Sequence, residues 1–196
     1  MALPVVPIAS SLGTSAAIPR PNPYPNELTD FAFWRDARWS SLVPLEASLA
    51  DVRRVLGEPA EAIDIAHYGD PYPGDDAAAQ PVLVYRDAPG WHAYVYLVRS
   101  DLSVSARYPA QLQGRLLSIE LVPDARVPFA DRIPRDVFHG TTATGADASW
   151  TDYEDGSGLR YEVYTRDLPR GKQRAGDLNR IVYGPSDAQK QRVQIR

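Results

Sequence analysis

The second half of this 196-residue chain repeats the first, and this repeat limits the possible folds more than any other feature. Residues 84–96 align on residues 152–164 at an offset of 68, and the same residue type recurs in five pairs: Tyr85 and Tyr153, Asp87 and Asp155, Gly90 and Gly158, Val95 and Val163, Tyr96 and Tyr164. Residues 114–123 align on residues 176–185 at an offset of 62, so the intervening loop shortens by six residues. Repeated units stack so that each covers an apolar face of its neighbour. We therefore interpret the chain as two copies of one β-meander.

Composition and charge restrict the class of protein. With 44% hydrophobic and 23% charged residues, the chain has the composition of a globular domain. A net charge of −4 argues against a general nucleic-acid-binding protein, although residues 160–196 hold nine Lys and Arg against four Asp and Glu. We interpret this basic end as a solvated Arg-rich loop between two strands, with a site for an anion or an acidic partner as the alternative. Because the chain has no cysteine, it forms neither a disulfide nor a thiolate zinc site.

The chain is expected to begin with an extended arm and to continue as two units. Residues 1–29 contain six prolines, each of which removes a backbone donor and disfavours the α region in the preceding residue. This segment is therefore predicted to be a polyproline-like arm, which either lies along its own domain or acts as a recognition ligand. The first unit is expected over residues 30–125 and a second, shortened unit over residues 126–196.

One short helix is predicted from its end signals. Ser48 is a good N-cap, and Asp51 falls where a carboxylate meets the free N–H groups of the first turn. Gly57 favours a left-handed conformation at the C-terminal end, and Pro59 prevents continuation. Between these signals, apolar residues recur at helical spacing: Leu49, Val52, Val55 and Leu56. Because only one face of the helix is apolar, the helix must lie on another element.

That element is predicted to be an antiparallel sheet. Segments rich in β-branched and aromatic residues predict strands over 81–87, 91–100 and 115–122, and the repeat predicts equivalent strands over 150–154, 159–165 and 178–184. Residues 60–68 are a further candidate strand. The sequence thus predicts an α+β protein built from two tandem repeats, in each of which short helices pack on an antiparallel β-meander.

Alternation along the strands assigns side chains to two faces of the sheet. The face under the helix is predicted to hold apolar side chains: Trp91, Ala93, Val95, Leu97, Leu117, Ile119, Leu121, Leu159, Tyr161, Val163, Ile181 and Tyr183. The opposite face holds polar and aromatic ones: His92, Tyr94, Tyr96, Ser118, Glu120, Arg160, Glu162, Tyr164 and Arg180. Tyrosine and arginine are enriched at protein interfaces, so this face is a candidate binding surface. The alternative is a sheet face in water, stabilised by cross-strand pairs.

The candidate binding residues on this face are Tyr94, Tyr96, Glu120, Arg160, Tyr164 and Arg180. No catalytic residue, metal or cofactor is expected, because the sequence lacks a nucleophile elbow, a phosphate-binding glycine loop and a zinc-protease helix motif. The histidines are too scattered to predict a metal site: His67, His92 and His139. Asp87 and Asp155 precede tight turns, so each carboxylate is expected to accept a hydrogen bond from the turn backbone. The aspartates of residues 69–76 lack the spacing of a calcium loop.

The helix and the residues before it resemble a known superfamily. Residues 39–59 read WSSLVPLEASLADVRRVLGEP, and the motif Asp-Val, three residues and Leu-Gly-x-Pro is similar to the helix-to-strand junction of the SmpA/BamE and β-lactamase-inhibitor-protein superfamily. The resemblance implies helices packed on an antiparallel sheet, a tandem unit as in the inhibitor proteins, and a concave sheet face that binds a partner. The second copy departs from the motif, because residues 129–134, which end in Pro134, occupy its place.

Together these features favour a non-catalytic protein that binds another protein outside the cytoplasm, in the periplasm or after secretion, as the resemblance to exported bacterial proteins implies. No nucleic-acid partner is expected, and no apolar stretch approaches the roughly 18 residues that would span a membrane. Two alternatives stay open. One is a small-molecule enzyme or ligand carrier with a pocket at the junction of the two units, which a cleft converging on His92, Glu120 and Arg180 would favour. The other is an assembly subunit that engages a neighbour through the Pro-rich arm.

Overall fold

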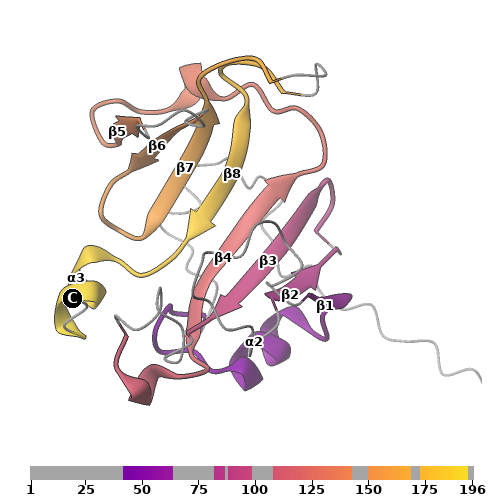
Figure 1. Cartoon of the computed structure of the whole chain (residues 1–196), viewed down its shortest axis with the longest axis vertical. Helices are drawn as coiled ribbons and strands as arrows, with labels where there is room; N and C mark the ends of the chain where they lie inside the picture. Colours follow the sequence, from indigo (N-terminus) through magenta and orange to yellow (C-terminus); the bar gives the residue numbers. More distant parts are fainter. Residues whose placement is uncertain are drawn as a thin grey trace, which may run out of the picture.

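One antiparallel sheet of eight strands makes up most of the structure (Figure 1). The computed structural model describes residues 42–63, 82–86, 88–98, 108–142, 150–168 and 173–193. Its strands are β1 (Glu61–Ile63), β2 (Val82–Tyr85), β3 (Trp91–Leu97), β4 (Leu116–Pro123), β5 (His139–Thr142), β6 (Trp150–Glu154), β7 (Leu159–Tyr164) and β8 (Leu178–Tyr183). The other described elements are the helices α2 (Leu49–Leu56) and α3 (Asp187–Arg192) and the 3-10 turns η2 (Ala110–Leu112) and η3 (Ala130–Arg132).

The sheet consists of two consecutive meanders that meet at their last strands. Its strand order is β1-β2-β3-β4-β8-β7-β6-β5, so β1 to β4 run in chain order from one edge and β5 to β8 run in chain order from the other. The two halves join where β4 pairs antiparallel with β8, with Glu120 opposite Val182. The centre of the sheet is therefore formed by two strands whose paired residues are 60 to 64 positions apart in the sequence.

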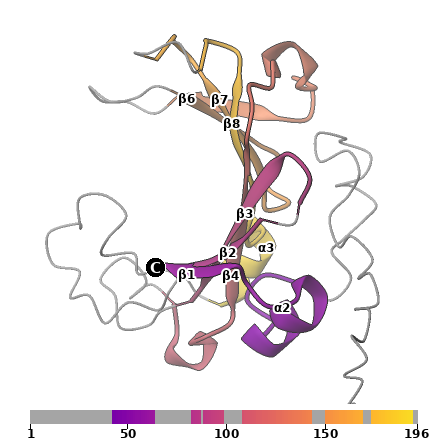
Figure 2. The same ribbon diagram turned by 90° about the vertical axis from the view of Figure 1, so that its right-hand side faces the viewer.

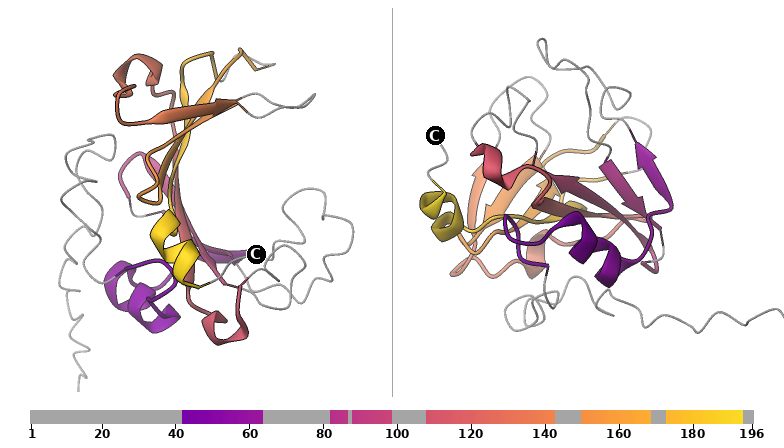
Figure 3. Two further views of the ribbon diagram at one scale, coloured as in Figure 1. Left: turned by 90° about the vertical axis from the view of Figure 1, so that its left-hand side faces the viewer. Right: turned by 90° about the horizontal axis from the view of Figure 1, so that it is seen from below.

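The sheet is strongly bent, with α2 and the segment around η3 against its convex side (Figures 2 and 3). The core lies on this convex side, where Val52 and Leu56 of α2 belong to the same buried cluster as Val95 and Ile119 of the sheet. In the second half no α-helix covers this side within the described residues. Phe129, Ile133 and Phe138 from the irregular segment before β5 take that position, and the two phenylalanine rings lie 5.1 and 5.4 Å from the ring of Tyr161.

The predicted helix is confirmed, together with its end signals. Ser48 is the N-cap and forms a capping box with Asp51, whose carboxylate accepts the Ser48 backbone N–H at 2.9 Å. These hydrogen bonds hold the pKa of Asp51 down at about 2, chiefly through the backbone of Ser48. Gly57 ends the helix with a φ of 87°, as expected, but its ψ of −160° places it outside the left-handed helical region. Val52 and Leu56 are buried beneath the helix.

The predicted strands are confirmed to within a few residues, whereas two elements were not foreseen. The strand expected over 60–68 is described only as the three residues of β1. Strand β5 was missed because its sequence, His-Gly-Thr-Thr, has no apolar alternation, and its first three residues are exposed at an edge of the sheet. Helix α3 was missed because it has no buried residue; it begins at a capping box of Ser186 and Gln189.

Leu117 of the predicted core lies outside it because of a β-bulge, and Leu97 is likewise only partly buried and outside the buried cluster. The register between β3 and β4 shifts after Tyr96, so that Leu97 pairs with Leu116 and Leu117 is skipped. Leu116 consequently occupies the core and is fully buried, whereas Leu117 is only partly buried. Strict alternation counted back from Ile119 predicts Leu117 in the core, because alternation takes no account of a bulge.

The predicted fold class is wrong: the structure is mainly an eight-stranded antiparallel sheet with two short helices among its described elements, not a tandem of helix-on-sheet repeats. The physical reason lies in residues 129–134, which occupy the place of the helix motif in the second copy. Pro128 precedes this stretch and Pro134 ends it, and only the single 3-10 turn η3 forms between them. Helix α3 does not replace it, because none of its residues is buried.

The internal duplication stays a prediction. The β2–β3 and β6–β7 hairpins pair in the register that the offset of 68 requires. The pairing of the following strands differs from the alignment. Ile119 lies opposite Val95, so the alignment requires Ile181 to lie opposite Val163, but Ile181 lies opposite Tyr161, two residues earlier. The boundaries of the two proposed units are likewise still predictions. The arm over residues 1–29, the loop over residues 69–76 and His67 lie outside the described residues.

Candidate functional site

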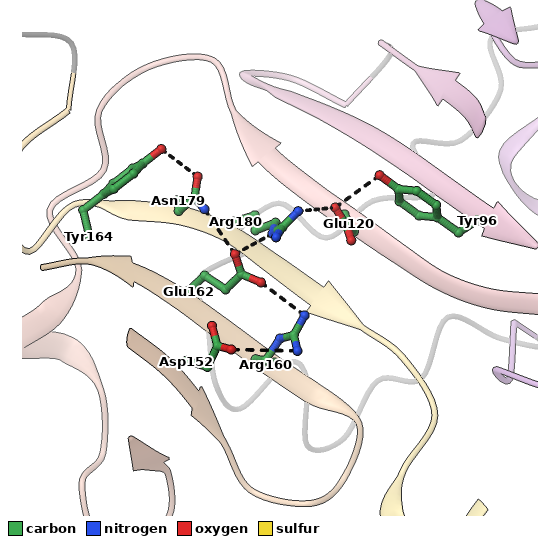
Figure 4. A network of polar contacts seen from close by, with 8 residues as sticks. All are labelled: Tyr96, Glu120, Asp152, Arg160, Glu162, Tyr164, Asn179 and Arg180. Carbon is green, nitrogen blue, oxygen red and sulfur yellow. Dashed lines mark hydrogen bonds and ion pairs between the residues drawn. The ribbon is translucent and has the colours of Figure 1, made fainter. Parts of the chain in front are cut away.

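A chain of ion pairs and hydrogen bonds crosses the concave face of the sheet at its centre (Figure 4). The cross-strand registers place its strand-paired members on the face opposite to Ala93 and Val95, and alternation had predicted this face for all members except Asp152 and Asn179. We call this set the polar network; its members are Tyr96, Glu120, Asp152, Arg160, Glu162, Tyr164, Asn179 and Arg180. They come from five strands or their bulges, β3, β4, β6, β7 and β8, so the network spans both meanders.

Arg180 of β8 is the link between the two halves of the network. Its Nη1 donates to Glu120 of β4 at 2.8 Å, and its Nε donates to Glu162 of β7 at 2.5 Å. The guanidinium thus joins the two strands on either side of β8. These charge-assisted hydrogen bonds are stronger than those between neutral groups and fix the orientation of all three side chains.

Glu162 is the most deeply buried charge of the network, with only 1% of its side chain exposed. Besides Arg180, its carboxylate accepts hydrogen bonds from Asn179 at 3.1 Å and pairs with Arg160 at 3.1 Å. Asn179 faces Glu162 because the β7–β8 register shifts there and leaves Asn179 as the bulged residue. Three partners compensate the desolvation that a buried carboxylate would otherwise suffer.

The two tyrosines of the network use their hydroxyl groups within the protein. Tyr96 donates to Glu120 at 3.5 Å, and Tyr164 donates to the side-chain oxygen of Asn179 at 2.7 Å. Burial raises the pKa of both phenols, and the negative charge of Glu120 adds to the effect at Tyr96. Both hydroxyls therefore stay protonated at neutral pH, and their rings are held in fixed positions on the concave face.

The opposite end of the network is held less tightly. Arg160 and Asp152 lie 3.9 Å apart, near the limit for an ion pair. Asp152 Oδ1 and Arg160 Nε are both buried and have no hydrogen-bond partner among the described residues. A buried polar atom without a partner costs roughly 1–3 kcal/mol. Most of the stabilisation in the network must therefore come from the contacts of Arg180 and Glu162.

The network contains three carboxylates and two guanidinium groups, so one carboxylate is in excess. Burial raises the pKa of Glu120 and outweighs the charge of Arg180, which lowers it, while the charge of Glu162 adds to the rise. Burial and the charge of Glu162 also raise the pKa of Asp152. For Arg180, burial lowers the pKa, but the charges of Glu120 and Glu162 outweigh burial and raise it. The arginine is permanently charged, whereas the two acids ionise with difficulty.

The raised pKa of Glu120 makes the stability of the fold depend on pH. A carboxyl group whose pKa is higher in the folded than in the unfolded protein contributes stability below its ordinary pKa, here 4.5, and that contribution is lost as pH rises through the folded pKa. Glu120→Gln removes this dependence. We therefore expect the free energy of unfolding of E120Q, measured relative to wild type by urea denaturation, to increase as pH rises from 4.5. A difference that is constant with pH would contradict this.

A half-open hollow lies beside the network, between the ends of β4, β7 and β8 and the start of α3. Its volume is about 200 Å³, and both Glu120 and Arg160 contribute to its wall. The hollow does not include His92 or Arg180, so it is not the cleft that would favour an enzyme. The Nδ1 of His92 instead contacts the carboxylate of Asp124 at the other end of β3.

The structure brings together five of the six predicted binding residues: Tyr96, Glu120, Arg160, Tyr164 and Arg180. Tyr94 lies on the same face and is paired with Glu120 in the sheet register, but it is not part of the polar network. Sequence reasoning missed Asp152 and Asn179 and left Glu162 out of the candidate residues. The alternation of Trp150, Asp152 and Glu154 along β6 would have placed Asp152 on this face, whereas no sequence signal marks Asn179.

The remaining predicted sites have structural explanations. Asp155 accepts hydrogen bonds from the backbone and hydroxyl of Ser157 at 2.9 and 2.6 Å, which confirms its predicted role in the turn. Asp87 is outside the described residues. His139 lies exposed on β5. In the described part of the chain, no group of three or more histidine or acidic side chains is placed to hold a metal ion.

Comparison of the chain with family models, curated proteins and solved structures finds no match. The resemblance of residues 39–59 to the SmpA/BamE and inhibitor-protein superfamily is therefore neither confirmed nor contradicted. None of the helices in the described ranges has the length and apolarity needed to cross a membrane. What this protein does has to be argued from the concave face itself.

Proposed function

We propose that this protein is a non-catalytic binding protein that recognises another protein through the concave face of its sheet. The observation that carries the proposal is the polar network, which fixes two tyrosines and two arginines in the middle of that face. Tyrosine and arginine are the side chains most often found at the energetic centre of protein interfaces. A face whose side chains are already held in place loses little conformational entropy on binding.

The internal contacts of the network also bear on specificity. Arg160 and Arg180 keep about a third of their side-chain surface exposed, at 36% and 30%, while Arg160 binds Glu162 through Nη2 and Arg180 binds it through Nε. Each guanidinium therefore presents a fixed edge to a partner. A face of this kind favours partners with matching polar groups and disfavours those that would leave its charges unpaired.

The proposal is tested by isolating partners from the source organism with the immobilised protein and measuring their affinity for purified variants. We expect Tyr96→Ala and Tyr164→Ala each to weaken binding by at least about 1–2 kcal/mol, as for interface anchors. The matched Tyr→Phe variants separate loss of the ring from loss of the hydroxyl contact. Val137→Ala is the control, because Val137 is exposed, 48% of its surface, and lies on the other side of the sheet.

Two results would contradict a binding role of this face. The first is a partner whose affinity is unchanged by both tyrosine variants but reduced by Val137→Ala. The second is a measured turnover that is lost when His92 and His139 are replaced together, since neither histidine belongs to the polar network. The free energy of unfolding of every variant has to be measured alongside, so that loss of binding is not confused with loss of fold.

A second candidate function, a small-molecule enzyme or ligand carrier, is favoured by the position of the hollow at the junction of the two meanders, beside two carboxyl groups with raised pKa. The size of the hollow argues against an enzyme or ligand carrier, because its volume of about 200 Å³ is less than the ~300–1,000 Å³ typical of small-molecule sites. An assembly role through the Pro-rich arm and a location outside the cytoplasm stay predictions of the sequence.

A further inference from the structure

We infer that the hollow beside α3 receives a lysine or arginine side chain of the partner protein. This inference rests on the proposed function, because it names the chemistry of the group that the concave face would recognise. It is carried by three features of the hollow: its size, the combination of an apolar wall with a charged rim, and the sign of the charge that surrounds it.

The shape of the hollow suits a single long side chain. Leu117, Val182 and Pro185 give part of its wall an apolar surface. Three glycines leave the backbone open around it: Gly156, Gly158 and Gly184. The aliphatic stem of a lysine or arginine packs on apolar surface while its charged head reaches a polar group, so the two halves of such a side chain match the two halves of the lining.

The charge around the hollow is negative. The residues that line the hollow include three carboxylates, Glu120, Glu154 and Asp187, against two cations, Arg160 and Lys190. The cations are already engaged: Lys190 binds Asp187 at 3.1 Å, and Arg160 binds Glu162. Within the described residues, no cation lies at ion-pair distance from Glu154, which is exposed at the rim.

An incoming cation would therefore be attracted chiefly by Glu154, and also by Asp187, which it would share with Lys190. An anionic side chain would meet repulsion from the same groups, and a neutral one would leave Glu154 without a counter-charge. Charge complementarity thus selects a basic side chain as the occupant.

The inference is tested on the full chain by NMR titration with N-acetyl-arginine amide and N-acetyl-lysine amide, following the backbone amide signals of Gly156, Gly158 and Gly184. The uncharged N-acetyl-norleucine amide serves as the matched probe without a head group. We expect saturable shifts with the two basic probes and none with the norleucine probe. Glu154→Gln and Asp187→Asn should each weaken binding of the basic probes about two- to fivefold, as for exposed ion pairs.

Asp131→Asn is the control variant, because Asp131 is an exposed acid of η3, on the convex side of the sheet. Equal shifts with the norleucine probe, or affinities that E154Q and D187N leave unchanged, would overturn the inference. The same glycine signals shifting with protein concentration, without any probe, would make a second copy of this chain the occupant and would also overturn it. If a partner protein responds to the tyrosine variants but not to E154Q or D187N, the proposed function stands and this inference fails.

Discussion

Replacing Gly158 with alanine is expected to destabilise the protein by roughly 2–5 kcal/mol, which combines left-handed backbone strain with overpacking. Gly158 has a φ of +96°, and a Cβ placed on it would lie 2.1 Å from the carbonyl oxygen of Gly184. The close approach is part of the structure, because the Gly184 N–H donates to the Gly158 carbonyl at 2.8 Å. The change is measured as the free energy of unfolding in urea.

Gly90→Ala is the matched control, since Gly90 aligns with Gly158 in the sequence repeat and has a similar φ of +76°. Apart from its neighbours in the chain, no atom of the described residues lies within 4 Å of a Cβ built at Gly90, so only the backbone strain of about 1–2 kcal/mol applies there. Equal losses of unfolding free energy in the two Gly→Ala variants would mean that the turn containing Gly158 moves away from Gly184 at little cost in energy.

Replacing Glu162 with alanine should destabilise the fold by roughly 3 kcal/mol, the lower end of the range for breaking a buried ion pair. The carboxylate is 1% exposed, and its loss leaves Arg160 and Arg180 without their shared counter-charge. The two arginines are about a third exposed, so water partly solvates their charges when Glu162 is absent. The loss of stability therefore stays at the lower end of the range. Thermal and urea denaturation at neutral pH measure the effect.

The control for this variant is Glu61→Ala, which removes a carboxylate paired with Arg86 at 2.9 Å. Both members of that pair are about half exposed, so its removal should cost no more than about 1 kcal/mol. Similar losses at Glu61 and Glu162 would indicate that the polar network lies open to solvent and contributes little to stability. A network of that kind would weaken the proposal of a pre-formed binding face.

Local features of the structure could be predicted from the sequence. Helix α2 was predictable because Ser48, Asp51 and Gly57 act on backbone groups within a few residues of themselves. The central strands were predictable because their apolar side chains alternate along one segment. Leu116 shows where this fails: a bulge depends on the partner strand, so the residue that enters the core cannot be read from one strand alone.

The candidate site was predicted only as a list of residues on one face. Alternation within β4 and β8 placed Glu120 and Arg180 on the same face, but their contact depends on β4 pairing with β8, and no local signal specifies that pairing. The burial of Glu162 could not be predicted either, because it results from Arg160 and Arg180 closing over it from neighbouring positions. The tandem-helix architecture failed for a related reason, since the repeat in the strands was extended to a segment that two prolines prevent from forming a helix.

The pairing of β4 with β8 affects the order in which the sheet folds. Strands β1 to β4 and β5 to β8 each pair with a neighbour in the chain, so their hairpins can form after the closure of comparatively short loops. The β4–β8 pairing must bring together residues 60 to 64 positions apart, which carries a larger loop-closure entropy and slows folding. We therefore expect the two meanders to assemble first and the pairing of β4 with β8 to form last. The complete concave face exists only once β4 has paired with β8. It would therefore be the final part of the protein to become functional.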